Sequence, residues 1–255
     1  MLTREIALAV GFSALAFGCA AQPSETQETI DNLVQAGFPA DDIMVIDGVV
    51  YVGGDAVVSL EASREMLKVD PSVTQEQYRT TNIVSPNVTN ICINGSELTG
   101  VLSTDLNQAI ANYSALGLTF HMTRTSGGTL GCNAVITAHV TTGTGNSSGF
   151  PSGGLPFNAI NISQETIKLP INLAGPLLMH ELGHTIGLRH SDFFNRSISC
   201  GGAATNEGTA GVGATLIPGS PSGATVGGSI MNSCLSTSES GQFSQSDINS
   251  LRTLY

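Results

Sequence analysis

The stretch HELGHTIGLRH at residues 180–190 restricts the local fold more than any other part of the chain. On a helix, residues four apart lie one above the other, so His180 and His184 point the same way and Glu181 lies beside them. Gly187 can adopt the left-handed conformation that ends a helix, which turns the chain so that His190 approaches from another side. The stretch therefore predicts a helix, a glycine stop and three imidazoles around one point.

Three imidazoles arranged in this way are typical ligands of a catalytic zinc ion, with a fourth position left for water. We therefore predict His180, His184 and His190 as zinc ligands and Glu181 as the general base. The alternative is that these histidines are solvated or satisfied within the core. It is disfavoured because each additional fixed residue of the long motif lowers the chance expectation by about twentyfold.

A second motif, GGSIMNS at residues 227–233, places an Ile-Met pair in a small, polar, Gly-rich turn. It looks like the Met-turn of the metzincin zinc peptidases, in which a methionine packs beneath the ligand imidazoles without binding metal. We therefore expect Met231 at the floor of the site. Asp192 either orients the turn or a ligand imidazole from behind, or is a solvated turn residue.

Three longer segments are MHELGHTIGLRHSDFFNRSISCGG at 179–202, GFPSGGLPFNAINIS at 149–163, and the C-terminal FSQSDINSLRTLY. They resemble the bacterial dual-action HEIGH metallopeptidase family, over most of the chain from about residue 30. Leu182 stands where the HEIGH motif of the family's name has Ile. A serine directly after the third histidine, here Ser191, is similar to the matrixins, although no cysteine-switch motif lies upstream. Ser233 stands where serralysins and astacins have tyrosine, so a tyrosine ligand is not supported. The resemblance implies a zinc peptidase.

These motifs predict an α+β, metzincin-like zinc peptidase domain with a twisted mixed sheet, a zinc-binding active-site helix, a Met-turn and a C-terminal helix. A small segment of helix and β-hairpin precedes it. Strands are expected at 87–93, 117–124, 133–140 and 157–163, and helices at about 103–115, from around 173, and at 244–254. The strand at 157–163 is predicted to be exposed beside the cleft and to bind an extended peptide by strand addition. A long irregular loop is expected between His190 and Met231, and His121 and His139 are interpreted as structural.

The N-terminus predicts export. An apolar run from Ile6 to Gly18 is too short to span a bilayer and is typical of a cleaved signal peptide, residues 1–18. Cys19 is a lipidation candidate in a lipobox-like context, with ordinary cleavage after Ala20 or Ala21 as the alternative. The product is then an outer-membrane or cell-surface lipoprotein, or a secreted protein.

Residues 19–80 form a candidate N-terminal segment, and residues 81–255 form the predicted catalytic domain. Residues 1–80 hold 12 acidic and 4 basic residues, against 8 and 5 in the remainder, so the composition changes near residue 80. Within the segment we predict a helix at 24–35, a hairpin at 43–52 and a helix at about 60–68. The segment is either an integral part of the fold or a pro-segment that covers the cleft until it is removed.

The cysteine count predicts two disulfides, and the net charge limits the classes of molecule that the protein binds. With Cys19 set aside, four cysteines allow three pairings, of which we favour Cys92–Cys132 and Cys200–Cys234 because the second would brace both sides of the site. A net charge of −11 without a Lys/Arg cluster argues against nucleic acid and anionic membrane, apart from an N-terminal lipid anchor. Calcium is not favoured, because the loops around the site carry few carboxylates. A monomer acting on protein or peptide substrates is expected.

Two functions follow from these features. The first is an exported zinc endopeptidase that hydrolyses peptide bonds through metal-activated water, with Glu181 as general base. The alternative is an exported zinc-binding surface or adhesion protein whose protease domain is inactive or latent. The intact Glu181 favours the first, because a structural zinc site would be closed by a fourth protein ligand.

Overall fold

The computed structural model describes residues 24–67, 77–143, 145–168, 173–208, 214–220, 223–237 and 239–255. The predicted signal peptide, the lipidation candidate Cys19 and the last residue of the second predicted helix, Lys68, lie outside this part of the chain. Across the described ranges, every helix is too short or too polar to cross a membrane.

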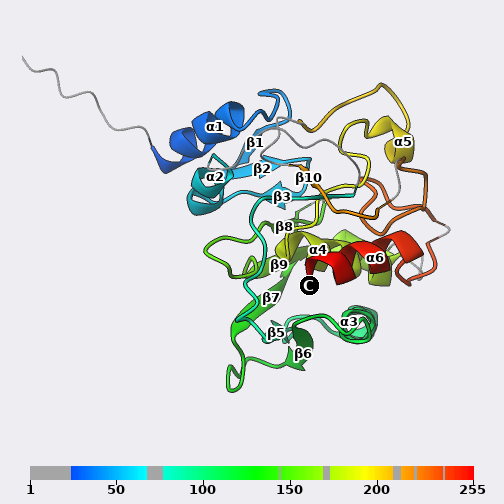
Figure 1. Ribbon diagram of the computed structural model, residues 1–255. Helices are drawn as coiled ribbons and strands as arrows, with labels where there is room; N and C mark the ends of the chain where they lie inside the picture. Colours follow the sequence, from blue (N-terminus) through cyan, green and yellow to red (C-terminus); the bar gives the residue numbers. More distant parts are fainter. Residues whose placement is uncertain are drawn as a thin grey trace, which may run out of the picture.

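The larger part of the chain is built on a four-stranded parallel sheet (Figure 1). In spatial order its strands are β6 (His121–Thr125), β5 (Asn90–Asn94), β7 (Ala134–Thr141) and β9 (Ala159–Ser163). Apolar side chains alternate along the strands, so that Ile91 and Ile93 of β5 and Ile160 and Ile162 of β9 are fully buried. The four predicted strands are confirmed, with boundaries shifted by a few residues.

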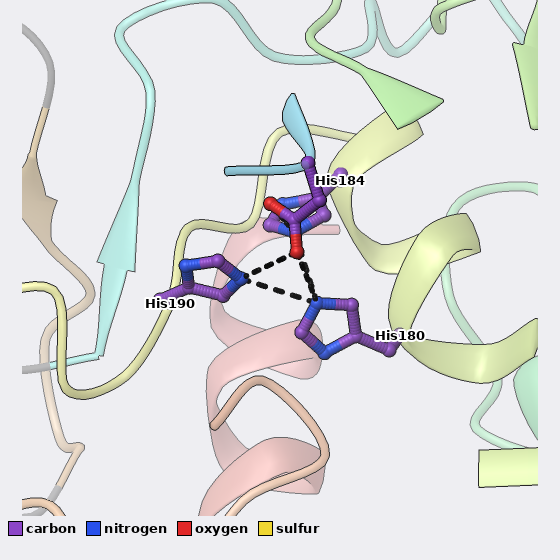
Figure 2. A group of neighbouring side chains, drawn as sticks. His180, His184 and His190 are labelled. Atoms are coloured by element: carbon purple, nitrogen blue, oxygen red, sulfur yellow. Dashed lines mark hydrogen bonds and ion pairs between the residues drawn. The ribbon is translucent and has the colours of Figure 1, made fainter. Parts of the chain in front are cut away.

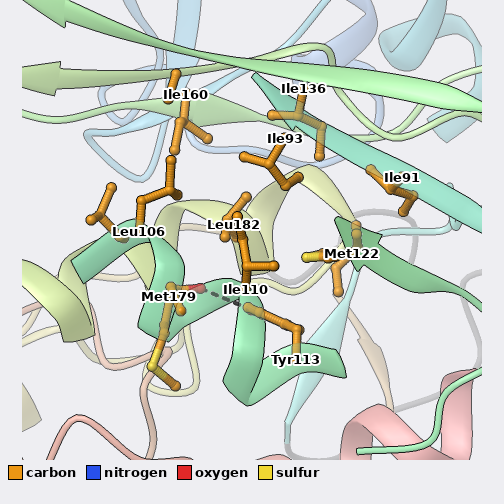
Figure 3. Close-up of a cluster of buried hydrophobic side chains, with 14 of the residues drawn as sticks. Ile91, Ile93, Leu106, Ile110, Tyr113, Met122, Ile136, Ile160, Met179 and Leu182 are labelled. Carbon is orange, nitrogen blue, oxygen red and sulfur yellow. Dashed lines mark hydrogen bonds between the residues drawn. The ribbon is translucent and has the colours of Figure 1, made fainter. Parts of the chain in front are cut away.

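Two helices cover this sheet and complete its core, as Figure 3 shows. They are α3 (Gly100–Ser114) and α4 (Ala174–Thr185), and they pack against each other as well as against strands. Leu106 of α3 and Leu182 of α4 are fully buried, and the Tyr113 hydroxyl donates to the Met179 carbonyl at 2.8 Å. Each such buried side chain contributes about 1.5–3 kcal/mol, and together they fix α4, the motif helix, against the sheet.

Residues 24–67 form a second, smaller body, which we call the N-terminal unit. It contains α1 (Glu25–Gln35), β1 (Met44–Ile46), β2 (Val49–Val52), β3 (Ala56–Val57) and α2 (Leu60–Met66). Ser24 and Ser59 cap the two helices with their side chains, and Asp47 and Gly48 take positive φ in the hairpin turn. The unit has its own apolar core, so the predicted helix, hairpin and second helix are confirmed.

The N-terminal unit joins the larger part through a short strand, β8 (Ser148–Gly149). β3 pairs parallel with β8, and Ser147, just before β8, exchanges two hydrogen bonds with Asn161 of β9 in antiparallel register. The central sheet is parallel throughout its described strands, and the mixed pairing that was predicted is found instead in the sheet β1-β2-β3-β8, where β3 pairs antiparallel with β2 and parallel with β8. The expectation of an exposed strand at 157–163 was wrong: β9 is largely buried, and Ser147 covers its outer side.

The remaining elements are short, apart from the last helix. They are β4 (Tyr78–Arg79), which pairs antiparallel with β10 (Thr215–Leu216), the 3-10 helix η1 (Gln164–Lys168), α5 (Ser197–Cys200) and α6 (Gln245–Leu254). The described parts of the 191–230 loop are irregular apart from α5 and β10, as expected. Ser244 and Asp247 form a capping box at the start of α6, so the closing helix predicted at 244–254 is confirmed.

Candidate metal centre

Helix α4 positions the first part of the motif. His180, Glu181 and His184 lie in its last turns, and each is at most 4% exposed. The helix is followed by Gly187 with φ of +103°, where a Cβ would lie only 2.7 Å from the Asn82 carbonyl oxygen. Both the conformation and the space therefore require glycine here. The resulting turn brings His190 back to the helix, as the spacing predicted.

The three imidazoles converge on one point (Figure 2). The Nε2 atom of His180 lies 3.1 Å from that of His184 and 3.2 Å from that of His190. All three side chains are buried, so these nitrogens have little contact with solvent.

The opposite ring nitrogens are each held by an acceptor. Nδ1 of His180 lies 2.8 Å from the Ile230 carbonyl, and Nδ1 of His184 lies 2.8 Å from the Leu188 carbonyl. Nδ1 of His190 lies 2.6 Å from the Glu207 carboxylate. A proton on each Nδ1 satisfies these acceptors, which leaves three Nε2 lone pairs directed at the same point.

This arrangement fits a bound cation. Three lone pairs at these separations repel one another unless a positive ion lies between them, and nitrogens on one tetrahedral zinc at about 2.0–2.1 Å lie about 3.3 Å apart. Two buried carboxylate oxygens, Oε2 of Glu181 and Oδ1 of Asp55, also lack a hydrogen-bond partner among the described residues. A metal ion held by the three histidines would account for this set of groups.

Asp55, in the turn between β2 and β3, completes the cluster from the N-terminal unit. Its ligand atom lies within 4.8 Å of those of the three histidines. Its carboxylate oxygens are 3.2 Å from Nε2 of His190, 3.6 Å from that of His180 and 3.7 Å from that of His184. The position that sequence analysis expected to be free for water therefore faces a carboxylate. No spacing rule connects Asp55 to the motif, which is why the sequence did not reveal it.

Burial and the charges of neighbouring groups together determine the pKa values of the site. Burial, followed by the charge of Asp55, raises the pKa of Glu181 well above its usual range. Burial also lowers the pKa of His184 well below its usual range. For His190, burial acts in the same direction, but the Asp55 and Glu207 carboxylates outweigh it and raise the pKa well above its usual range. For Asp55 burial acts in the opposite direction to the neighbouring imidazoles, His190 first, and these imidazoles hold its pKa well below its usual range.

The turn that contains Met231 lies beneath the helix. A Cβ on Gly183, between the two helix histidines, would lie 2.6 Å from the Met231 sulfur, so the sulfur packs directly under α4. Asp247 of α6 accepts from the Ile230 backbone at 3.1 Å and from the Ser229 hydroxyl at 2.6 Å. The first turn of α6 thus holds the turn whose Ile230 carbonyl orients His180, an arrangement that supports the Met-turn interpretation.

Glu207, not Asp192, is the carboxylate that holds Nδ1 of His190. Besides His190, Glu207 faces Arg189 at 3.3 Å and Arg196 at 3.2 Å, which compensate its buried charge. Asp192 is fully buried, which excludes the solvated alternative, and it accepts hydrogen bonds from Ser199 and Ser233. Sequence analysis did not reveal this contact, because Glu207 lies 17 residues after His190 along the chain and no spacing rule connects them.

Both favoured disulfides are present in the structure. Cys92 bonds to Cys132, and Cys200 bonds to Cys234. The second joins the segment after His190 to the segment after Met231, the same two segments that Asp192 connects through Ser199 and Ser233. The disulfide and the aspartate therefore both hold the segment after His190 to the segment after Met231.

Breaking the second disulfide should affect both stability and metal binding. Cys234→Ala is expected to lower the free energy of unfolding by about 2–5 kcal/mol, because the bridge closes a long loop in the unfolded chain. It should also weaken metal retention, because the loop between the two cysteines contains Glu207 and the floor of the site. Thermal unfolding and metal content after dialysis against a chelator measure the two effects.

Two matched variants separate these effects. Met231→Leu conserves volume and should cost under about 1.5 kcal/mol with little loss of metal. Cys132→Ala removes the other disulfide, whose segments provide no ligand, and should lower stability without changing metal retention. Equal metal retention in Cys234→Ala and Cys132→Ala would contradict the bracing role.

The other two histidines lie outside the cluster. His121 is exposed at the start of β6, and the His139 Nδ1 atom pairs with Glu97 at 2.9 Å on the surface. A pocket of about 290 Å³ opens beside the histidine cluster, lined among others by Gly53, Asp55, His180 and Glu181. It gives the cluster a route to solvent, partly walled by the N-terminal unit.

A comparison with known protein families agrees with the chemistry of this site. A family model described as dual-action HEIGH metallo-peptidase matches residues 50–255. Two solved structures of myroilysin are similar. One has 14% identity and a TM-score of 0.43 over 69% of this chain and 95% of that chain, and the other has 17% and 0.40 over 73% and 88%. No curated protein matches the chain.

Proposed function

The chain belongs to the dual-action HEIGH metallo-peptidase family, and from this premise we propose that it is an exported zinc endopeptidase with Glu181 as general base. Three convergent Nε2 atoms, each with its Nδ1 held in place, carry the assignment of His180, His184 and His190 as zinc ligands. Imidazole is a ligand that zinc prefers, and three protein ligands are typical of catalytic zinc.

In peptide hydrolysis, Glu181 transfers the proton, and other residues hold the imidazoles and the helix that carries them. When bound, zinc lowers the pKa of a coordinated water and polarises the scissile carbonyl, so that no protein nucleophile is needed. Glu181, one residue from His180, has a buried carboxylate oxygen without a partner among the described residues. It accepts a proton from the attacking water and returns that proton to the leaving amine. The Ile230 carbonyl holds Nδ1 of His180, and Met231 packs under α4.

Export is part of the proposal. Two disulfides in the folded chain favour an oxidising compartment, and the apolar run from Ile6 to Gly18 resembles a signal peptide. Lipidation at Cys19 would anchor the mature protein to a membrane, whereas cleavage after Ala20 or Ala21 would release it. Mass spectrometry of the mature N-terminus distinguishes the two.

One observation favours the second candidate function, a zinc-binding surface protein without activity. Asp55 lies where a fourth ligand would close the site, and closed four-ligand sites are typical of structural zinc. However, Asp55 comes from the N-terminal unit and not from the body that carries the histidines. The intact Glu181, which a structural site does not need, favours an enzyme whose site can open.

Peptide hydrolysis with and without metal tests the proposed function. We expect the full chain, or the chain after limited proteolysis of its N-terminal unit, to cleave a mixed peptide library. A zinc chelator should abolish this cleavage, and about one equivalent of added zinc should restore it. A zinc-loaded protein that cleaves no peptide in either form would support the surface-protein alternative instead.

A further inference from the structure

Asp55 reaches the metal centre from a separately packed body. The N-terminal unit has an apolar core of its own, including Leu33, Val50 and Met66, whereas the histidines belong to the core around the central sheet. The two cores meet at Phe150, which is buried among the residues of the N-terminal unit and stacks edge-on against His184 at 5.7 Å. The Asp55 carboxylate is thus supplied by a different body from the one that carries the histidines.

The backbone at Asp55 and just after it is hydrogen-bonded to β8 of the catalytic body and to the residue that follows β8. The Ser148 backbone donates to the Asp55 carbonyl at 3.1 Å, and the Phe150 backbone donates to the Val57 carbonyl at 3.3 Å. β3 therefore adds a strand to β8 directly beside the metal ligands, as an extended peptide does when it binds a sheet edge. A Cβ on Gly149 would lie 2.7 Å from the Val57 oxygen, so this contact is close.

The turn before Asp55 is fitted to the groups behind the metal ligands. Gly53 has φ of +64°, and a Cβ there would lie 3.0 Å from Oε2 of Glu207, the carboxylate that holds His190. The Gly53 backbone also donates to the Asp42 carboxylate at 3.0 Å, within the same unit. Only glycine combines this conformation with this proximity. The turn thus presents Asp55 in one defined position, with its side chain 19% exposed.

We infer that Asp55 is the fourth ligand of the metal in the full chain, and that the N-terminal unit thereby holds the peptidase in a latent state. The inference rests on the proposed function. The Asp55 carboxylate occupies the position that water and the scissile carbonyl need, so Glu181 has no water from which to take a proton. β3 at the same time occupies the edge of β8. Displacement of the unit, without any covalent step at the metal, frees both positions.

The ligand role of Asp55 is testable on the full chain loaded with Co²⁺ in place of zinc. The variants are Asp55→Asn and Asp55→Ala, and the control is Asp47→Asn, which removes the same charge from an exposed turn of the same unit at a φ that asparagine tolerates. The visible absorption of Co²⁺ reports its ligands, and titration with acetohydroxamate reports access to the open position. Thermal unfolding verifies that each variant is folded.

We expect the spectrum to change in both Asp55 variants and to stay as in the wild type for Asp47→Asn. Acetohydroxamate should bind the Asp55 variants about 10-fold or more tightly than the wild type, because a closed state lowers the apparent affinity in proportion to the open fraction. Unchanged spectra and equal affinities would overturn the inference. So would ready binding of acetohydroxamate to the wild-type full chain, a measurement that needs no variant.

Peptide hydrolysis by the zinc-loaded forms separates this inference from the proposed function. Higher activity in Asp55→Asn than in the wild type and in Asp47→Asn supports both. If Asp55→Asn binds acetohydroxamate tightly but cleaves no peptide, the ligand role stands and the peptidase proposal fails. If the wild type already cleaves peptides as fast as Asp55→Asn and binds acetohydroxamate equally well, the peptidase stands and the latent state is refuted.

Discussion

Glu181→Gln is expected to leave the metal bound and to lower peptide turnover by about 10²-fold or more, the lower range for loss of a general base. Glutamine keeps the size and the hydrogen-bonding reach of glutamate but cannot accept the proton of the attacking water. The ligand imidazoles and their Nδ1 partners are unchanged, so metal content should stay at about one ion per chain. Steady-state kinetics together with metal analysis of the same preparation measure both quantities.

The control for this variant is Glu165→Gln. Glu165 is an exposed carboxylate on η1 that pairs with Lys168 on the surface, so its replacement should change neither turnover nor metal content. The measurements should use whichever form of the chain hydrolyses peptide, because a latent site would hide the loss. Near-normal turnover in a metal-loaded Glu181→Gln protein would show that another group transfers the proton.

The features predicted from the sequence are those that local geometry determines. The spacing of His180 and His184 on a helix, the left-handed Gly187 and the turn at Asp47 and Gly48 each depend on a few neighbouring residues. The structure therefore agrees with the sequence on α4, the turn after it and the hairpin. The apolar alternation of β5 and β9 likewise follows from the twofold period of a strand.

The features that the sequence missed depend on how distant segments pack. β3 and β8 are two residues long each, and β8 lies in a Gly/Ser-rich stretch, so neither shows a strand period. Their pairing is decided by the docking of the N-terminal unit, and the same docking places Asp55. Without it, a hairpin followed by an aspartate carries no indication of a metal site.

Packing also decides which of two nearby carboxylates, Asp192 or Glu207, contacts His190, and the sequence does not show this. Asp192 lies two residues after His190 and was the natural candidate to orient it, but the side chain turns toward Ser199 and Ser233. Glu207 reaches His190 because the backbone after α5 returns to the site, where the Glu207 amide donates to the Phe193 carbonyl at 2.8 Å. Closeness in the sequence is therefore a poor predictor of which loop side chain contacts His190, because the hydrogen bonds of the loop determine its path.

Replacing His190 is expected to have the largest effect on metal binding. His190→Ala takes away the one proposed imidazole ligand that lies outside α4, and it leaves the buried Glu207 carboxylate without its imidazole partner. Loss of a group that only supports a ligand costs about 10–100-fold in metal affinity, so loss of a ligand should cost more than about 100-fold. Competition with a chelator of known affinity measures this, and peptide turnover should fall in parallel.

The matched control is His139→Ala, which removes an exposed imidazole that pairs only with Glu97 in the described structure. It should keep full metal content and turnover, because His139 lies outside the cluster of ligand atoms. Comparison with His180→Ala tests whether all three imidazoles act as one set, since each should then lower metal content and turnover together. Full metal retention in His190→Ala would remove His190 from the ligand set and leave the helix pair with Asp55 as the remaining ligands. Such a site would be bound across the two bodies of the chain, and displacement of the N-terminal unit would then release the metal instead of opening its coordination position.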